Sequence, residues 1–324
     1  MKALIYYALS HAHHHKTAKS IYNIITGKKS HQTFFDASSQ QLLSLYHSLP
    51  HLKYPSFERF FEEFQNNYED NNPTIYIHPR HTFESLVLTF KALQLFVQTL
   101  SHHVHDTYQF TPITEQRHIQ QRVKHVFQEV RAQHLETDVQ TEIYKLFQQL
   151  NSEMTHSVLH YYLTGYEDSM YTSHQVSLIE GKPLSDIKLQ EYNELVQCVK
   201  ALEDKTLCPI LSQCIMRPSL SHKTFKSLQL LRKGRSPEQI AHIQNIKLST
   251  IEDHLLEMFI KGYLNNYSAF VSDEEIASFH AYYQQDPERR LKVYKEAFPN
   301  LTYFAIKLMI VGIERGDVSV KAST

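Results

Sequence analysis

Glycine is scarce in this sequence, with only seven glycines in 324 residues. Loops that cradle phosphate need several glycines close together, because backbone amides must approach the ligand without a Cβ in the way. The chain contains no GxxxxGK[ST], GxGxxG, GxSxG or HExxH motif. These absences argue against nucleotide hydrolysis, dinucleotide-dependent redox chemistry, serine hydrolysis and zincin chemistry. We therefore predict no catalytic residues, no cofactor and no small-molecule substrate.

Cysteine is also rare, and long apolar runs are missing. The three cysteines are an odd number without a CxxC pair, which indicates a reducing compartment rather than a disulfide framework. A metal site of Cys208, Cys214 and His222 is conceivable, but buried free thiols are the favoured interpretation. Residues 1–9 are too short for a signal peptide, and no later segment is apolar enough to span a membrane. We expect a cytoplasmic protein without a membrane partner.

Neither sign of charge is in excess. The formal net charge is −1 and the pI is about 7.1, so any surface that attracts nucleic acid must be local. The 22 histidines qualify this conclusion, because an ordinary imidazole is partly cationic below neutral pH. If the protein binds nucleic acid, its affinity should rise as the pH falls through about 6.5.

Helical periodicity dominates what the sequence does contain. Apolar residues recur at spacings of three and four, while strand-like alternation is scarce, so an all-α fold is predicted. We expect an N-terminal trihelical unit at 1–72, a central helical bundle at 73–205 with a loop at 166–186, a linker at 206–218, and a helix-turn-helix domain at 219–324. Within that last domain, GYLNNYSAFV (262–271) has room for a minimal wing.

The helix-turn-helix prediction rests on the stretch GRSPEQIAHIQNIKLSTIEDHLLEMFIKG (234–262). Ser236 and Gln239 form a capping box, with Pro237 in the first turn of the second helix. Ser249 is the expected cap of the third helix, which Gly262 ends. The third helix carries an apolar stripe on one side. We expect its other side to be exposed and to face a protein partner; that side holds Thr250, Asp253, His254, Glu257 and Lys261.

Base recognition by this third helix is not favoured, because arginine, asparagine and glutamine are absent from its expected exposed side. The basic residues gather instead at helix corners, where cations can hold phosphates without reading sequence. An alternative is that they are solvated helix ends that complement the helix dipole. The DNA-binding candidates are Lys16, Lys19, Lys28, Lys29, Arg232, Lys233, Arg235 and Lys247.

Two segments have a metal-binding pattern, although no native metal site is predicted. The SHAHHHK run places His11 and His15 at a helical i, i+4 spacing, but without a carboxylate or cysteine nearby. Two ExxH pairs, Glu115/His118 and Glu153/His156, are typical of di-iron helical bundles. Such a site needs two more glutamates, and chance pairs are expected in a histidine-rich chain.

The two ends of the chain resemble each other. NIITGKKSHQTF and QLLRKGRSPEQI both contain an apolar helix end, a glycine, basic residues and a serine cap. Duplication of a trihelical unit explains this likeness, and so does the shared need of two helix pairs for similar stop and start residues. Both interpretations stay open.

The C-terminal stretch resembles the helix-turn-helix module found at the C-terminal end of RecQ-type helicases. The matching residues are Thr224, Leu228, Gly234, Ser236, Ile240, Ala241, Thr250, Ile251, His254 and Leu255. IYNIITGKKSHQTFFDA and LTFKALQLFVQTLSHH look like the YpbB family, so the resemblance extends over nearly the whole chain. It implies an accessory protein of a RecQ-type helicase and brings no catalytic residues with it.

Our leading hypothesis from the sequence is therefore a non-catalytic accessory protein of a RecQ-type DNA helicase. It would contact the DNA backbone, largely without sequence specificity, through basic helix corners during repair or recombination. The alternatives are a sequence-specific helix-turn-helix transcription regulator and a purely protein-binding adaptor.

Overall fold

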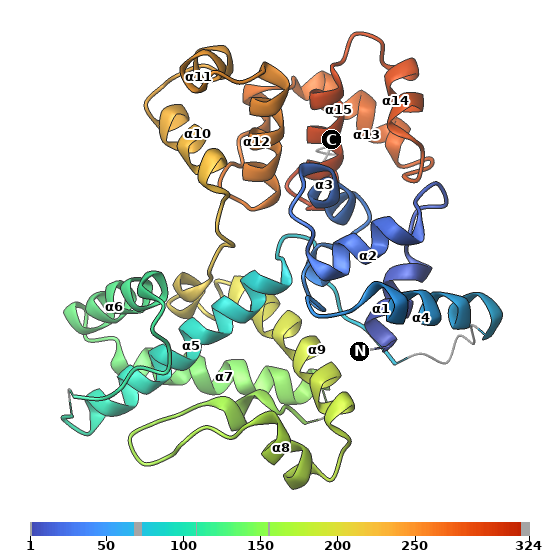
Figure 1. Ribbon diagram of the computed structural model, residues 1–324. Coiled ribbons are helices and arrows are strands. Elements are labelled where there is room, and N and C mark those ends of the chain that lie inside the picture. Colours follow the sequence, from blue (N-terminus) through green and yellow to red (C-terminus); the bar gives the residue numbers. More distant parts are fainter. Residues whose placement is uncertain (1, 68–72, 108, 155, 319–324) are drawn as a thin grey trace. The chain divides into compact units, whose positions relative to one another are not determined.

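The computed structural model describes residues 2–67, 73–107, 109–154 and 156–318, and every regular element in these ranges is a helix (Figure 1). The predicted all-α class is confirmed. None of these helices is both long and apolar enough to cross a membrane. The chain divides into two compact units. We call Asn72–Tyr76 with Glu84–Arg217 the bundle unit, and Lys2–Asn71 with Ile77–Phe83 and Pro218–Thr324 the HTH unit.

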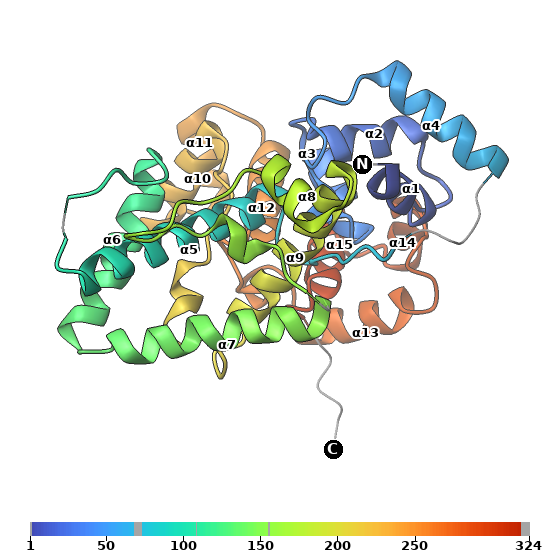
Figure 2. The same ribbon diagram turned by 90° about the horizontal axis from the view of Figure 1, so that it is seen from below.

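The bundle unit is built from long amphipathic helices (Figures 1 and 2). Its elements are α5 (Phe83–Val104), α6 (Arg117–Ala132), α7 (Glu136–Met154), η2 (Leu159–Tyr162), α8 (Ser173–Glu180), α9 (Leu184–Glu203) and η3 (Leu211–Cys214). α9 packs against both α7 and α8. Leu146, Leu150 and Val199 are buried, as their helical spacing requires.

Two segments of the bundle unit are more ordered than the sequence suggested. The expected loop at 166–186 contains α8, whose N-terminus has a complete capping box between Thr172 and Gln175. The expected linker at 206–218 includes η3. The backbone N–H groups of Ile210 and Leu211 donate to the buried Glu142 carboxylate, at 3.0 and 2.9 Å. These bonds attach the segment to α7, so it is part of the bundle unit.

All three cysteines are free and buried, as favoured from the sequence. Burial raises the pKa of the Cys208 and Cys214 thiols to about 12. It raises the pKa of Cys198 as well. These side chains therefore stay protonated at neutral pH and serve as small apolar core residues.

The HTH unit joins helices from both ends of the chain. Those from the N-terminal end are α1 (Lys2–Ser10), α2 (Ala18–Thr26), α3 (His31–Ser39), η1 (Leu43–Leu45) and α4 (Tyr54–Asn67). Those from the C-terminal end are α10 (His222–Arg232), α11 (Pro237–Gln244), α12 (Leu248–Ile260), η4 (Tyr267–Ala269), α13 (Asp273–Tyr283), α14 (Leu291–Ala297) and α15 (Tyr303–Glu314). α3 packs against α2, α12 and α15. Segments treated as separate domains from the sequence thus share one compact unit.

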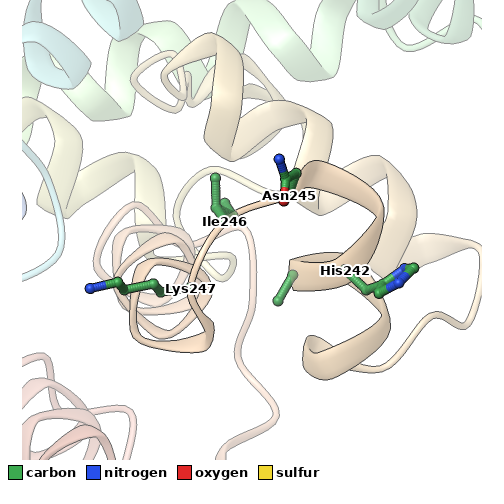
Figure 3. Close-up of a pocket in the computed structure, with 5 residues that line it drawn as sticks. His242, Asn245, Ile246 and Lys247 are labelled. Atoms are coloured by element: carbon green, nitrogen blue, oxygen red, sulfur yellow. The ribbon is translucent and has the colours of Figure 1, made fainter.

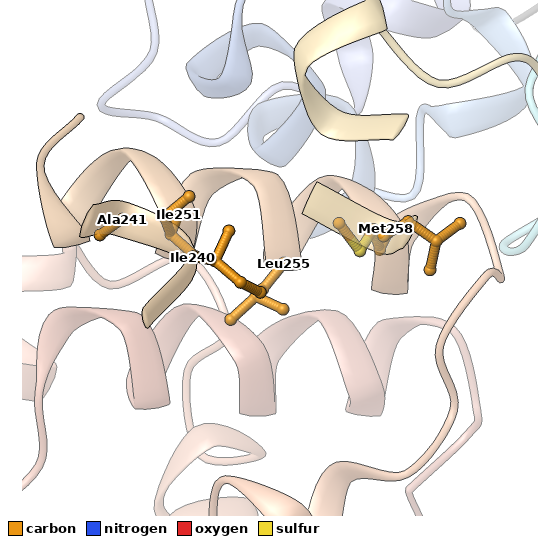
Figure 4. Packing of buried hydrophobic residues seen from close by; sticks show 6 residues of the cluster. Ile240, Ala241, Ile251, Leu255 and Met258 are labelled. Carbon is orange, nitrogen blue, oxygen red and sulfur yellow. The ribbon is translucent and has the colours of Figure 1, made fainter. Parts of the chain in front are cut away.

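The helix-turn-helix core lies where α10, α11 and α12 meet. Its buried cluster consists of Leu228, Ile240, Ala241, Ile251, Leu255 and Met258 (Figure 4). Ile251, Leu255 and Met258 lie at helical spacings of four and three along α12, so one stripe of that helix faces α10 and α11. The predicted capping box of Ser236 and Gln239 is present at the start of α11.

Two local expectations for this region are wrong. The third helix, α12, begins at Leu248, with Lys247 rather than Ser249 at its N-cap position and without a side-chain cap. A cap changes the free energy of a helix by about 1 kcal/mol, so tertiary packing can set the start one or two residues away. Residues 262–271 contain the short helix η4 and no strand, so the described chain has no wing.

Candidate nucleic-acid interface

The corner between α10 and α11 presents three exposed cations within four residues, Arg232, Lys233 and Arg235. Gly234 ends α10 in the left-handed region, with φ of 76°. Its N–H donates to Leu231 O at 2.9 Å. This turn fixes the backbone that carries the cations, and none of the three forms an ion pair with another described residue. Glu238 is the acidic residue nearest to these cations in the sequence, and its carboxylate accepts a hydrogen bond from Ser236 Oγ at 2.7 Å.

The turn between α11 and α12 adds Lys247 at the exposed start of α12. Asn245 takes the left-handed conformation that reverses the chain, with φ of 52°. An open hollow of about 590 Å³ lies here, lined by Ala241, His242, Asn245, Ile246 and Lys247. Figure 3 shows the His242, Asn245 and Lys247 side chains pointing in different directions. Small-molecule sites have converging polar groups, so this hollow does not fit such a ligand.

The corner between α2 and α3 has the same local construction. Gly27 ends α2 with φ of 75°, Lys28 and Lys29 are exposed, and Ser30 caps α3 by accepting from Thr33 N. Tyr46 Oη donates to the carbonyls of Gly27 and Lys28, at 3.2 Å each, and holds the turn in place. The similarity of the two corners agrees with both explanations of the sequence likeness.

The two remaining lysine candidates are engaged with neighbouring side chains. Lys16 is largely buried and its Nζ lies 2.7 Å from the Asp36 carboxylate, so it is not a free phosphate ligand, contrary to expectation. Lys19 Nζ lies 3.5 Å from the centre of the Tyr54 ring. That lysine is exposed and can still meet a phosphate, while the aromatic ring orients its side chain.

The side of α12 that was expected to be exposed is mostly covered. Thr250 and Asp253 are partly exposed, but His254 and Glu257 are only 2% and 7% exposed, and the Lys261 side chain 9%. The expected exposure is therefore wrong for these last three residues. The reason is α3, a helix more than 200 residues earlier in the chain, which packs against this side of α12. A partner-facing role for the five residues stays a prediction.

The contacts beneath α3 form a polar network. His254 Nδ1 lies 2.8 Å from Ser227 Oγ, and its ring centre is 5.7 Å from that of His31 on α3. Burial lowers the pKa of His254, and the nearby His31 and Lys223 lower it further; burial and these two cations together outweigh the opposing effects of Glu257 and Asp253. Neutral His254 therefore belongs to the interior of the HTH unit and adds no positive charge to its surface.

Because α12 packs against α3, α10, α11 and α15, residues 254–260 form an unbroken buried run. A helix that reads bases must enter the major groove with a free face. The exposed part of α12 is its start, at Lys247, Leu248 and Ser249, followed by the partly exposed Thr250, Glu252 and Asp253. The geometry thus favours contact with the DNA backbone at the corners over base recognition along α12. Nothing in the local sequence of α3 or α12 predicts this pairing.

The structure does not gather the histidine patterns into metal sites within the described residues. α1 ends at Ser10, so His11 and His15 do not share a helix, and burial lowers the pKa of His13 to about 4. His118 is exposed on α6, while His156 lies 3.0 Å from Glu180. No group of metal-ligating atoms among the described residues includes either ExxH pair.

Comparison with known proteins gives two matches. Residues 223–310, which run from α10 into α15, match a family described as a helix-turn-helix domain. Over 246 residues the chain is 24% identical to Protein YpbB of Bacillus subtilis (strain 168), covering 73% of this chain and 68% of that protein. No solved structure matches the chain. The predicted resemblance to the YpbB family and the presence of a helix-turn-helix module are therefore confirmed.

Proposed function

We propose that this protein is a non-catalytic accessory protein of a RecQ-type DNA helicase that holds the DNA backbone through basic corners of its HTH unit. The corner formed by Arg232, Lys233 and Arg235 is the observation that carries this proposal. Three exposed cations without ion pairs lie on a backbone whose turn is fixed by Gly234. Lys247, in the following turn of the same helix-turn-helix, adds a fourth exposed cation. Such a surface suits phosphate oxygens, and contacts to phosphate carry no direct sequence information.

The helicase partnership and a role in repair or recombination rest on the resemblance to the YpbB family and to the module of RecQ-type helicases. The absence of phosphate-binding and hydrolase motifs from the sequence supports an accessory role rather than catalysis. In this proposal the helicase supplies the enzymatic activity, while this chain holds DNA without strong sequence preference.

The proposal is tested by fluorescence-anisotropy titration of labelled single-stranded, duplex and forked DNA at several salt concentrations. We expect affinity that falls steeply with salt, because each phosphate contact releases counterions. Replacing Arg232, Lys233 and Arg235 with glutamine should reduce the slope of log Kobs against log[salt] by about 2 to 3, at roughly 0.7 to 0.9 per lost contact.

The matched control replaces three other exposed cations of the HTH unit, Lys53, Arg290 and Lys292, with glutamine. Its net charge changes by the same amount, so it separates a local contact from a general electrostatic effect. An equal loss of DNA affinity in both variants would show that the corner makes no specific contact with DNA. Pull-down of a RecQ-type helicase from the same cell, compared with an unrelated helicase, tests the partner.

A purely protein-binding adaptor is the second candidate, and a different observation favours it. Leu178 and Ile179 on α8 are 71% and 50% exposed, and soluble proteins usually cover large apolar side chains that lie side by side. Complete absence of salt-dependent DNA binding, together with capture of the helicase, would select this candidate. A sequence-specific regulator would instead yield an enriched motif in random-sequence selection, which the covered α12 does not favour.

A further inference from the structure

The helix α6 (Arg117–Ala132) of the bundle unit is strongly basic. It carries Arg117, Arg122, Lys124 and Arg131 against a single acid, Glu129. In Figures 1 and 2, α6 lies at the periphery of its unit. All four cations are exposed. The basic character of this helix does not stand out in the sequence, because its charges are spread over four turns instead of lying in one run.

Three of the cations form a straight row. Arg117, Lys124 and Arg131 are seven residues apart, and steps of seven residues shift the direction of an α-helical side chain by only about 20°. At 1.5 Å per residue the row spans about 21 Å. We call these three residues the α6 row. Gln121 and Gln128 lie between them on the same exposed side, while Ile119, Val123, Val126 and Val130 face the core.

Helix stability does not explain the α6 row as a whole. Surface helices commonly neutralise a cation with an acid three or four residues away, but no acid stands at those spacings from Arg117, Lys124 or Arg131. Glu129 lies 3.3 Å from His125 instead. Among the described residues, no member of the row forms a salt bridge. Arg131, in the last turn, complements the helix dipole, but Arg117 is in the first turn, where the dipole opposes a positive charge.

We propose that the α6 row is a second nucleic-acid-binding surface that holds phosphates along about 21 Å of a strand. This inference rests on the proposed function and extends it from the HTH unit to the bundle unit. A row of this length spans about six nucleotide steps of a duplex at 3.4 Å each. The amides of Gln121 and Gln128 supply donors and acceptors for sugar and phosphate oxygens between the cations.

The same face does not suit a membrane. An amphipathic helix that lies on a lipid surface needs an apolar side to insert, and the four apolar residues of α6 named above are fully committed to the protein core. An acidic peptide would satisfy the charge, but the regular spacing along a straight line matches the repeating phosphates of a nucleic acid strand more closely.

The test uses the full-length protein with Arg117, Lys124 and Arg131 replaced by glutamine, which keeps high helix propensity. The control replaces the exposed Lys145, Lys200 and Lys205 of the same unit with glutamine, an identical change of charge. Both variants are checked by circular dichroism and thermal unfolding. Binding of labelled duplex and single-stranded DNA is then measured against salt, alongside the Arg232/Lys233/Arg235 variant, anionic phosphatidylserine vesicles and poly-glutamate.

We expect the row variant to bind DNA several-fold more weakly, with a salt slope smaller by about 2 to 3, while the control stays close to wild type. Loss in the corner variant with no loss in the row variant overturns this inference and leaves the proposed function standing. A loss of DNA affinity in the row variant alone supports the inference and shows that the corner does not bind DNA. No DNA binding by the wild-type protein at low salt overturns both. Row-dependent binding to vesicles or poly-glutamate without binding to DNA also overturns the inference.

Discussion

Glu257 is a buried charged residue with several hydrogen-bond partners. Its carboxylate accepts from Lys261 Nζ at 2.7 Å, Thr224 Oγ1 at 2.6 Å and Ser221 N at 3.4 Å. Burial by itself raises the pKa of Glu257, but Lys261 and these hydrogen bonds outweigh it and hold the pKa below its ordinary value. Lys261 Nζ also lies 4.8 Å from the centre of the Phe34 ring. One carboxylate therefore helps to hold α10, α12 and α3 together.

Replacing Glu257 with glutamine should lower the free energy of unfolding by about 2 to 4 kcal/mol, because Lys261 is left buried without its counter-ion. Urea unfolding followed by far-UV circular dichroism measures the loss. The control is Glu296→Gln, since Glu296 and Lys292 form an exposed pair at 3.8 Å that contributes less than about 0.5 kcal/mol. Similar losses in the two variants would contradict the structural role given to Glu257.

At the scale of elements, glycine ends α2 and stands between α10 and α11. Gly27 and Gly234 both have left-handed backbones, with φ of 75° and 76°. Their surroundings differ. A Cβ on Gly27 would lie 2.4 Å from Cδ2 of the His47 ring, whereas a Cβ on Gly234 would meet nothing within 4 Å. The first glycine is needed for both conformation and space, and the second for conformation alone.

Gly234→Ala should therefore cost about 1 to 2 kcal/mol, the usual penalty of a left-handed residue that has a Cβ. Gly27→Ala should cost a further 1 to 3 kcal/mol or so, because the His47 side chain must move. Thermal and urea unfolding of both variants measure the difference. A Gly234 variant as unstable as the Gly27 variant would show that the space around the turn does not matter.

At the scale of the whole molecule, the reactivity of the cysteines depends on opening of the bundle unit only. Cys198, Cys208 and Cys214 all lie in the bundle unit, and the HTH unit has none. Burial keeps their pKa values well above the ordinary thiol range, so at pH 8 the reactive thiolate is scarce as well as shielded.

We predict that the native protein reacts with Ellman's reagent at pH 8 at least about a hundredfold more slowly than the urea-unfolded chain, because reaction requires opening of the bundle unit. Three thiols should be titrated after unfolding. Fast reaction of one thiol in the native protein would show that its part of the bundle unit opens locally.

Local interactions explain what could be predicted from the sequence alone. The all-α class, the capping box at Ser236 and the helix ends at Gly27 and Gly234 depend on residues within one or two turns of each other. The absence of phosphate-binding and hydrolase motifs is likewise a property of short segments. The exposed corners followed from the same signals, because charged residues beside a helix end rarely become buried.

Tertiary structure alone decided which helix faces are free. His254 and Glu257 follow the pattern of an exposed helix side, yet α3 covers them, and Lys16 is paired with Asp36 instead of being available to phosphate. α8 forms inside a stretch that resembled a loop, since its single buried residue, Val176, packs with Val158 and Ile187. Periodicity identifies the apolar side of a helix but not a polar side that a second helix covers through hydrogen bonds and ion pairs, because such a contact joins residues far apart in the chain.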